Sequence, residues 1–197
     1  MASYRAIHGA LTALKDYLDV RLGEGLAGVI DHPSLRILGS EDLLDKPSGN
    51  VLGIYLHRVS VDSFGRNRYL QPQGIGRIPR PELPVNLHIL LIGWSDKAVA
   101  EVTLVAWAMQ LIGSALELDI SHLGLVDPRW GNDDTVQVIP EEMSTEDLMR
   151  VWDSLPGDYH LSSPYIIKTL RLEPEQAPTE APLARSIVTP FEEVGEV

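Results

Sequence analysis

The stretch LPVNLHILLIGW, residues 83–94, is the strongest structural signal in the sequence. Its side chains alternate between two faces along its whole length, which predicts a β-strand. One face would hold Val85, Leu87, Ile89 and Leu91, and the other Asn86, His88, Leu90 and Ile92. Because both faces are largely apolar, we expect this strand to lie in the interior of a covered sheet.

Four further segments are predicted to be strands of the same sheet. Two of them are long, namely NVLGIYLHRVSV (50–61) and SPYIIKTLRLE (163–173). The other two are short, namely LRILG (35–39), which suits an edge of the sheet, and TVQVIP (135–140). In residues 50–61 we expect Leu52, Ile54 and Leu56 on one face, and Val51, Tyr55, His57 and Val59 on the other. This strand is also apolar on both faces, which favours an interior position.

Three segments have helical spacing. Apolar residues recur every three or four positions through residues 4–22, and Gly23 and Gly25 are expected to end that helix. Residues 96–118 predict a second helix, with Asp96 as the candidate N-cap. Because charge is sparse along it, we expect it to be buried on more than one side. Ser144 followed by Asp147 predicts a capping box for a third helix.

Together these elements predict an α/β (α+β) fold with one mixed or antiparallel sheet flanked by helices. Residues 1–173 would form this single domain. From Pro174 onward prolines alternate with glutamates, a composition that cannot hold a core. Residues 174–197 are therefore predicted to form an extended Pro/Glu-rich tail.

Composition narrows the class of protein. The chain has 197 residues, 44% of them hydrophobic and 22% charged, which is typical of a soluble globular protein. Its net charge of −12 argues against binding to nucleic-acid phosphates. There is no cysteine, so disulfides and zinc–thiolate sites are excluded. No run approaches the ~20 apolar residues of a membrane span, and the N-terminus lacks the apolar stretch of a signal peptide.

Catalytic and metal-binding patterns are not found in the sequence. The six histidines lack the spacing of a helical zinc pair, and there is neither a GxSxG elbow nor a phosphate-binding GxxxxGK[ST]. His57 and His88 are predicted to be cross-strand neighbours with structural roles. Asp133 and Asp134 resemble part of a calcium loop but lack its ligand spacing, so a solvated loop is favoured. We therefore expect no enzyme activity, no metal site and no cofactor.

Two segments are candidates for interaction. The connection 62–82 holds four of the chain's 16 basic residues, and could dock on an acidic protein, bind a phosphorylated ligand or be merely solvated. The tail holds one β-prone island, SIVTPF (186–191), which could add a strand to a partner's sheet or be an ordinary disordered terminus.

The order of several motifs, from Tyr4 to Glu173, resembles a known family. The most specific part is RPELPVNLHILLIGW, which precedes a later strand that begins YHLSSPY. The matching segments are the N-terminal helix, IYLHRV (54–59), GRN (65–67), RPELPVNLHILLIGW (80–94), AEVTLVAWAMQLIGSAL (100–116), LMRVWDSL (148–155) and YHLSSPYIIKTLRLE (159–173). In these segments the chain is similar to the cap, or tail-terminator, proteins of contractile injection systems of the antifeeding-prophage and virulence-cassette type.

The resemblance implies a ring, expected to be a hexamer, that ends the inner tube and sheath at their proximal end. Inner-tube and sheath proteins would be its partners, without nucleic acid and without membrane insertion. Assembly would take place in the bacterial cytoplasm as part of a phage-tail-like particle, with which the protein could then be released or associated with a membrane. The expected contacts are Arg66, Asn67, Arg68, Arg77 and Arg80 in the loop, and Ser186, Ile187, Val188, Thr189, Pro190 and Phe191 in the tail.

Two further expectations complete this interpretation. Apolar surface on the helix 96–118 is expected to help pack neighbouring protomers. The alternative function, from a different class, is a small-molecule or phosphate-binding regulatory module that uses the arginine-rich loop 62–82.

Overall fold

The structure is a computed structural model, and it describes residues 3–44, 47–63, 82–123, 130 and 135–173. Its elements follow one another along the chain in the order helix, three strands, helix, strand, short helix, strand, helix, strand. They are α1 (Arg5–Gly25), β1 (Ser34–Leu38), β2 (Val51–Val61), β3 (Leu83–Trp94), α3 (Ala98–Ile112), β4 (Leu116–Leu118), α4 (Ile120–Leu123), β5 (Val136–Pro140), α5 (Thr145–Asp153) and β6 (Ser162–Leu172).

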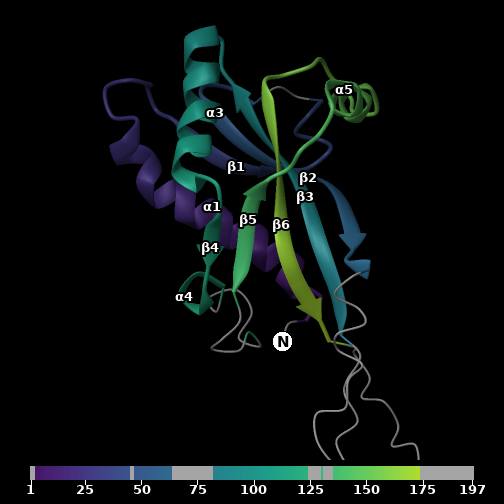
Figure 1. Ribbon diagram of the computed structural model, residues 1–197. Helices are drawn as coiled ribbons and strands as arrows, with labels where there is room; N and C mark the ends of the chain where they lie inside the picture. Colours follow the sequence, from purple (N-terminus) through teal and green to yellow (C-terminus); the bar gives the residue numbers. More distant parts are fainter. Residues whose placement is uncertain (1–2, 45–46, 64–81, 124–129, 131–134, 174–197) are drawn as a thin grey trace, which may run out of the picture.

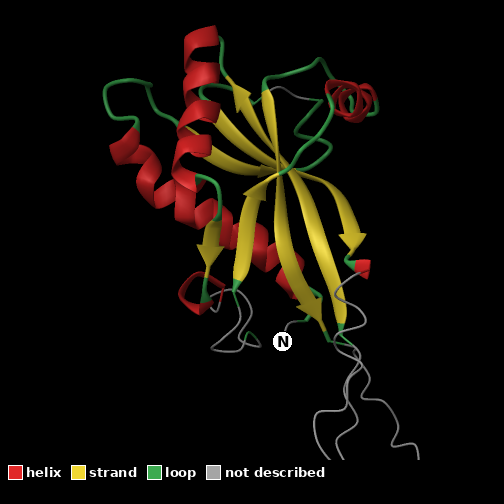
Figure 2. Cartoon of the chain, viewed as in Figure 1, coloured by secondary structure: helices red, strands yellow, loops and turns green. Residues whose placement is uncertain are grey.

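The strands form one six-stranded mixed sheet in the order β1-β2-β3-β6-β5-β4. β1 runs parallel to β2, and the other neighbours are antiparallel. Helices α1 and α3 cover one face, and α5 lies against the other, as Figure 1 and Figure 2 show. The predicted fold class is confirmed, with 83–94 inside the sheet and 35–39 at its edge.

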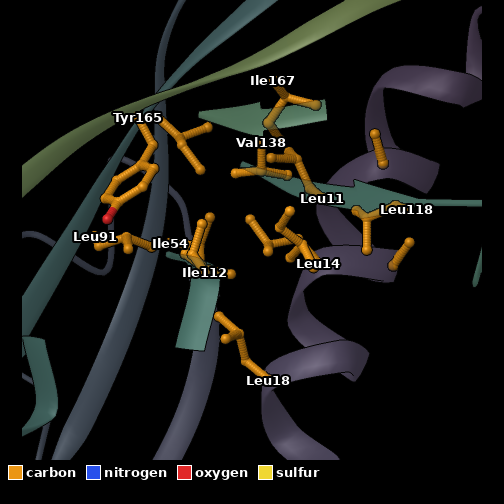
Figure 3. Packing of buried hydrophobic residues seen from close by; sticks show 14 of the residues in the cluster. Leu11, Leu14, Leu18, Ile54, Leu91, Ile112, Leu118, Val138, Tyr165 and Ile167 are labelled. Atoms are coloured by element: carbon orange, nitrogen blue, oxygen red, sulfur yellow. The ribbon is translucent and has the colours of Figure 1, made fainter. Parts of the chain in front are cut away.

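The main core lies between the sheet and the helices α1 and α3. Leu11, Leu14 and Leu18 of α1 point toward the inner face of the sheet, where Ile54 and Leu91 meet them (Figure 3). Leu14, Leu18, Ile54 and Leu91 are fully buried. Burying one such side chain contributes about 2 kcal/mol, so this layer is the chief source of stability.

A smaller core lies on the opposite face, under α5. Trp152 of this helix packs against Val51, Tyr55 and Ile92, and its Nε1 donates a hydrogen bond to Ser162 Oγ at 3.0 Å. The predicted cap is confirmed: Ser144 Oγ accepts from the Asp147 backbone N–H at 3.1 Å. The Asp147 carboxylate accepts from the Ser144 hydroxyl, which ties the cap from both sides.

A β-bulge changes the side-chain alternation of β2. Leu56 pairs with Ile89, but Arg58 pairs with His88, so His57 is an extra residue without an opposite partner. Every side chain after the bulge lies on the face opposite to the one that simple alternation gives. The prediction for Val59 was therefore wrong, because Val59 pairs with Leu87 and shares the face of the main core.

Helix α3 is shorter than predicted, and its solvent-facing side is not covered. It begins after Lys97, which occupies the N-cap position instead of Asp96, and Gly113 ends it with φ of +62°. Residues Leu116–Leu118 are strand β4, paired with β5. The buried residues lie on one side only, namely Ala100, Leu104, Val105, Ala108 and Ile112. The prediction that this helix is buried on more than one side was therefore wrong for a single chain.

Candidate functional site

The residues predicted to contact tube and sheath lie outside the part of the chain that the structure describes. This holds for Arg66, Asn67, Arg68, Arg77 and Arg80 in the loop and for Ser186, Ile187, Val188, Thr189, Pro190 and Phe191 in the tail. The Asp133–Asp134 pair also lies outside it. These assignments stay predictions, and the described residues offer three other features of functional interest.

The first feature is an apolar stripe on the outer side of α3. Val99, Val102 and Met109 are 79%, 55% and 44% exposed, and Ala106 is exposed between the last two. Their spacing of three, four and three residues places them in one row along the helix. We call these four residues the α3 stripe. A row of large apolar side chains in water is costly unless something covers it.

The α3 stripe contains no charge because the helix contains almost none. Over 15 residues it holds one charged side chain, Glu101, whereas a helix of this length would hold about three at ordinary composition. Glu101 faces the sheet, where its Oε1 accepts from the Leu161 backbone N–H at 3.2 Å and lies 3.7 Å from His160 Nδ1. The outer side of α3 thus bears no charged side chain, and its exposed polar residue is Gln110 near the end of the helix.

The second feature lies where β2 ends and β3 begins. Val59, Val61 and Leu83 are 46%, 50% and 44% exposed. Val59 pairs with Leu87 and Val61 with Val85, so these side chains share the face of the main core. We call these three residues the sheet-end patch. Sequence reasoning missed it, although the consecutive polar residues His57 and Arg58 interrupt the apolar alternation and signal the bulge.

The third feature is a polar cluster on the opposite face of the sheet. His88 is 4% exposed and lies between two partners on other strands: its Nδ1 is 2.7 Å from Glu141 Oε1, and its Nε2 is 2.7 Å from Ser60 Oγ. Because a carboxylate only accepts, Nδ1–H is the donor to Glu141, while Nε2 shares a hydrogen bond with the Ser60 hydroxyl. Arg58 Nη2 lies 3.6 Å from the same Glu141 oxygen.

His57 borders this cluster and confirms the predicted cross-strand neighbourhood. Its ring centroid lies 6.1 Å from that of His88. Burial lowers the pKa of His57, and the nearby Arg58 charge acts in the same direction, while the Glu141 carboxylate opposes both. Among the described residues, no hydrogen-bond partner reaches His57 Nε2. The neutral form of His57 is therefore the favoured form in the folded chain.

The chain Ser60–His88–Glu141 has the order of groups found in hydrolytic triads, yet its setting is that of a structural link. His88 is enclosed, and the three residues come from β2, β3 and the end of β5, so their hydrogen bonds tie these strands together. Within the described ranges, His, Asp and Glu form no group of three or more that could hold a metal ion. The cluster thus links three strands on the face of the sheet opposite to α1 and α3.

Comparison with known proteins identifies the family. A family model described as the Pvc16 N-terminal domain matches residues 10–186. The chain belongs to this family. The match includes the residues of the three features above. It confirms the resemblance to cap proteins that we inferred from the order of motifs between Tyr4 and Glu173. It ends inside segment 174–197, so the division into a domain 1–173 and a tail stays a prediction.

Two solved structures are similar to this member of the Pvc16 N-terminal domain family. The PVC sheath/tube terminator of an extracellular contractile injection system, in its extended state, has 16% sequence identity and a TM-score of 0.49, with 92% of this chain and 64% of that chain covered. The tube-terminating cap of the anti-feeding prophage has 17% identity and a TM-score of 0.45, with 88% and 60% covered. The chain thus spans less than two thirds of either protein. No curated protein matches it in sequence.

Among the described helices, none combines the length and the apolar character that crossing a membrane requires.

Proposed function

We propose that the chain is a structural cap, or terminator, of a contractile injection system. It would form a ring, expected to contain six copies, on the last layer of the inner tube and sheath at their proximal end. Membership in the Pvc16 N-terminal domain family over residues 10–186 is the observation that carries this proposal. The particle would be an extracellular phage-tail-like machine that is assembled in the bacterial cytoplasm.

A physical argument supports the same function. Tube and sheath subunits add by head-to-tail contacts that do not close along the axis, so a separate protein must occupy the last growing face. Such a protein needs exposed complementary surfaces and no catalytic centre. Both the α3 stripe and the sheet-end patch are exposed apolar surfaces of this kind. The ring would carry the charge of its copies, −12 each, and we expect it to meet its partners through its few basic segments, such as the arginine-rich loop.

Loss of the protein tests this function directly. We expect a strain that lacks it to make tubes and sheaths of uncontrolled length or sheaths that fall apart, and electron micrographs of purified particles measure both. Complementation with the intact chain should restore one uniform length. Particles of normal length and stability in the deletion strain would contradict the cap function.

The arginine-rich loop can be tested in the same strain. Complementation with Arg66→Glu and Arg68→Glu together should restore uniform length less well than the intact chain, because charge reversal repels an acidic partner surface. Arg150→Glu is the matched control, since Arg150 is exposed on α5 and pairs with Glu146 within the same helix. Equal complementation by both variants would remove the loop from the contact surface.

A further inference from the structure

The α3 stripe and the sheet-end patch lie on different elements: the stripe is on the outer side of α3, and the patch is where β2 ends and β3 begins. In Figure 1, α3 stands at the upper left, whereas β2 ends at the right. Val99 and Val102 of the stripe expose more than half of their surface, and Val61 of the patch exposes half. A single copy therefore carries two separate apolar surfaces that are open to water.

We propose that the α3 stripe of one copy packs against the sheet-end patch of the next copy. This inference rests on the ring proposed above and assigns its contact surfaces. Two different surfaces of one molecule make a heterologous contact, which repeats from copy to copy and closes when the rotation fits. In a closed ring, every copy then buries both of its apolar surfaces.

Charge favours a second copy as the occupant of the stripe. Each copy carries a net charge of −12, so copies repel one another over most of their surfaces. The outer side of α3 bears no charged side chain, because the only one in the helix, Glu101, faces the sheet. The three residues of the sheet-end patch are likewise uncharged. Contact through these uncharged residues does not itself bring carboxylates of two acidic copies together, although Asp62 and Glu82 adjoin the patch in the sequence.

A symmetric contact between two α3 stripes explains the structure less well. It would bury the stripe in both copies but leave Val59, Val61 and Leu83 exposed in each. It would also close after two copies, because an isologous contact uses the same surface on both sides. The heterologous contact accounts for both surfaces with one interface.

Two double variants separate these arrangements. Val102→Glu with Met109→Glu places charge in the α3 stripe, and Val59→Glu with Val61→Glu places charge in the sheet-end patch. All four positions are exposed, so the fold should persist, and circular dichroism with thermal unfolding checks this. Leu44→Glu is the matched control, because Leu44 is 64% exposed and its neighbour Leu43 packs on the opposite face under α5.

Analytical ultracentrifugation at about 100 μM protein measures the mass of the assembly that each variant forms. The intact chain and Leu44→Glu should form a ring, and each double variant alone should sediment as a 21.7 kDa monomer. An equimolar mixture of the two double variants should form a species of twice that mass and nothing larger, because the pair retains one intact contact.

Three results would overturn the inference. They are a monomeric intact chain, a ring formed by either folded double variant, and a dimer formed by the Val59→Glu, Val61→Glu variant alone. The last result is the one that a symmetric α3 contact gives. None of these results contradicts the cap function, which the deletion strain tests separately. If a double variant formed a full ring and still capped the particle, the proposed contact surfaces would be wrong and the cap function would stand.

Discussion

Gly93 of β3 is a residue at which α3 comes close to the sheet. A Cβ at this position would lie 2.8 Å from the Glu101 backbone oxygen and 3.0 Å from a Val105 methyl carbon. Gly93→Ala should therefore push α3 away from β3 and lower the free energy of unfolding by about 1–3 kcal/mol. Urea unfolding followed by circular dichroism measures this change.

Gly23 is the control for this prediction. It lies in α1, and a Cβ added there would meet nothing within 4 Å, so Gly23→Ala should raise the free energy of unfolding by about 0.5–1 kcal/mol. Equal effects of the two substitutions would show that close packing at Gly93 is not limiting.

His57 should make stability depend on pH. Its pKa is lowered in the folded chain by burial, so the unfolded chain takes up a proton first as the pH falls below about 6.5. The free energy of unfolding should therefore decrease from pH 7.5 to pH 5.5, and His57→Gln should reduce that decrease. Urea unfolding midpoints at the two pH values measure it.

The matched substitution is His8→Gln, which removes an exposed histidine of α1. It should leave the difference between the two pH values as it is in the intact chain. If His57→Gln and His8→Gln behave alike, desolvation of His57 does not govern the acid response.

At the scale of an element, α5 depends on its N-cap. Ser144 Oγ accepts from the Asp147 N–H, and the short helix packs on the sheet chiefly through Trp152. Ser144→Ala should cost about 1 kcal/mol of unfolding free energy, because one N–H at the helix start loses its acceptor. Ser154→Ala is the control at the other end, where the hydroxyl only donates to the Val151 carbonyl. Thermal unfolding that shows an equal loss for both would argue against the cap.

Elements were predicted best where alternation or helical spacing is long. The twelve residues of β3 and the apolar spacing of α1 leave little choice of structure. The end of α3 was not predicted, because Ala115, Leu116 and Leu118 continue the apolar content of the helix while Gly113 turns the chain. The bulge at His57 was also missed, since it depends on the register against β3.

At the scale of the whole molecule, the described core is complete at β6, whose last buried residue is Leu170. A chain truncated after Glu173 should therefore keep its fold, with a melting temperature within a few degrees of the full chain. It should bind sheath protein more weakly, because Ser186–Phe191 is proposed to add a strand to a sheath subunit.

Co-sedimentation of both forms with purified sheath measures this binding. A truncated chain that binds as tightly as the full chain would remove the strand-addition proposal. A truncated chain that unfolds would instead show that residues 174–197 belong to the domain.

The sequence by itself determined the sheet and the family. Period-two and helical spacing follow from backbone geometry, and the sequence of residues 10–186 matches the model of the Pvc16 N-terminal domain. Tertiary structure alone decided which apolar residues stay in water. A shift of register puts Val59 and Val61 on the face of the main core, where they stay about half exposed. The α3 stripe is exposed because the sheet covers only the other side of the helix. Hydrophobicity is a property of a residue, but its exposure depends on what the rest of the chain packs against it.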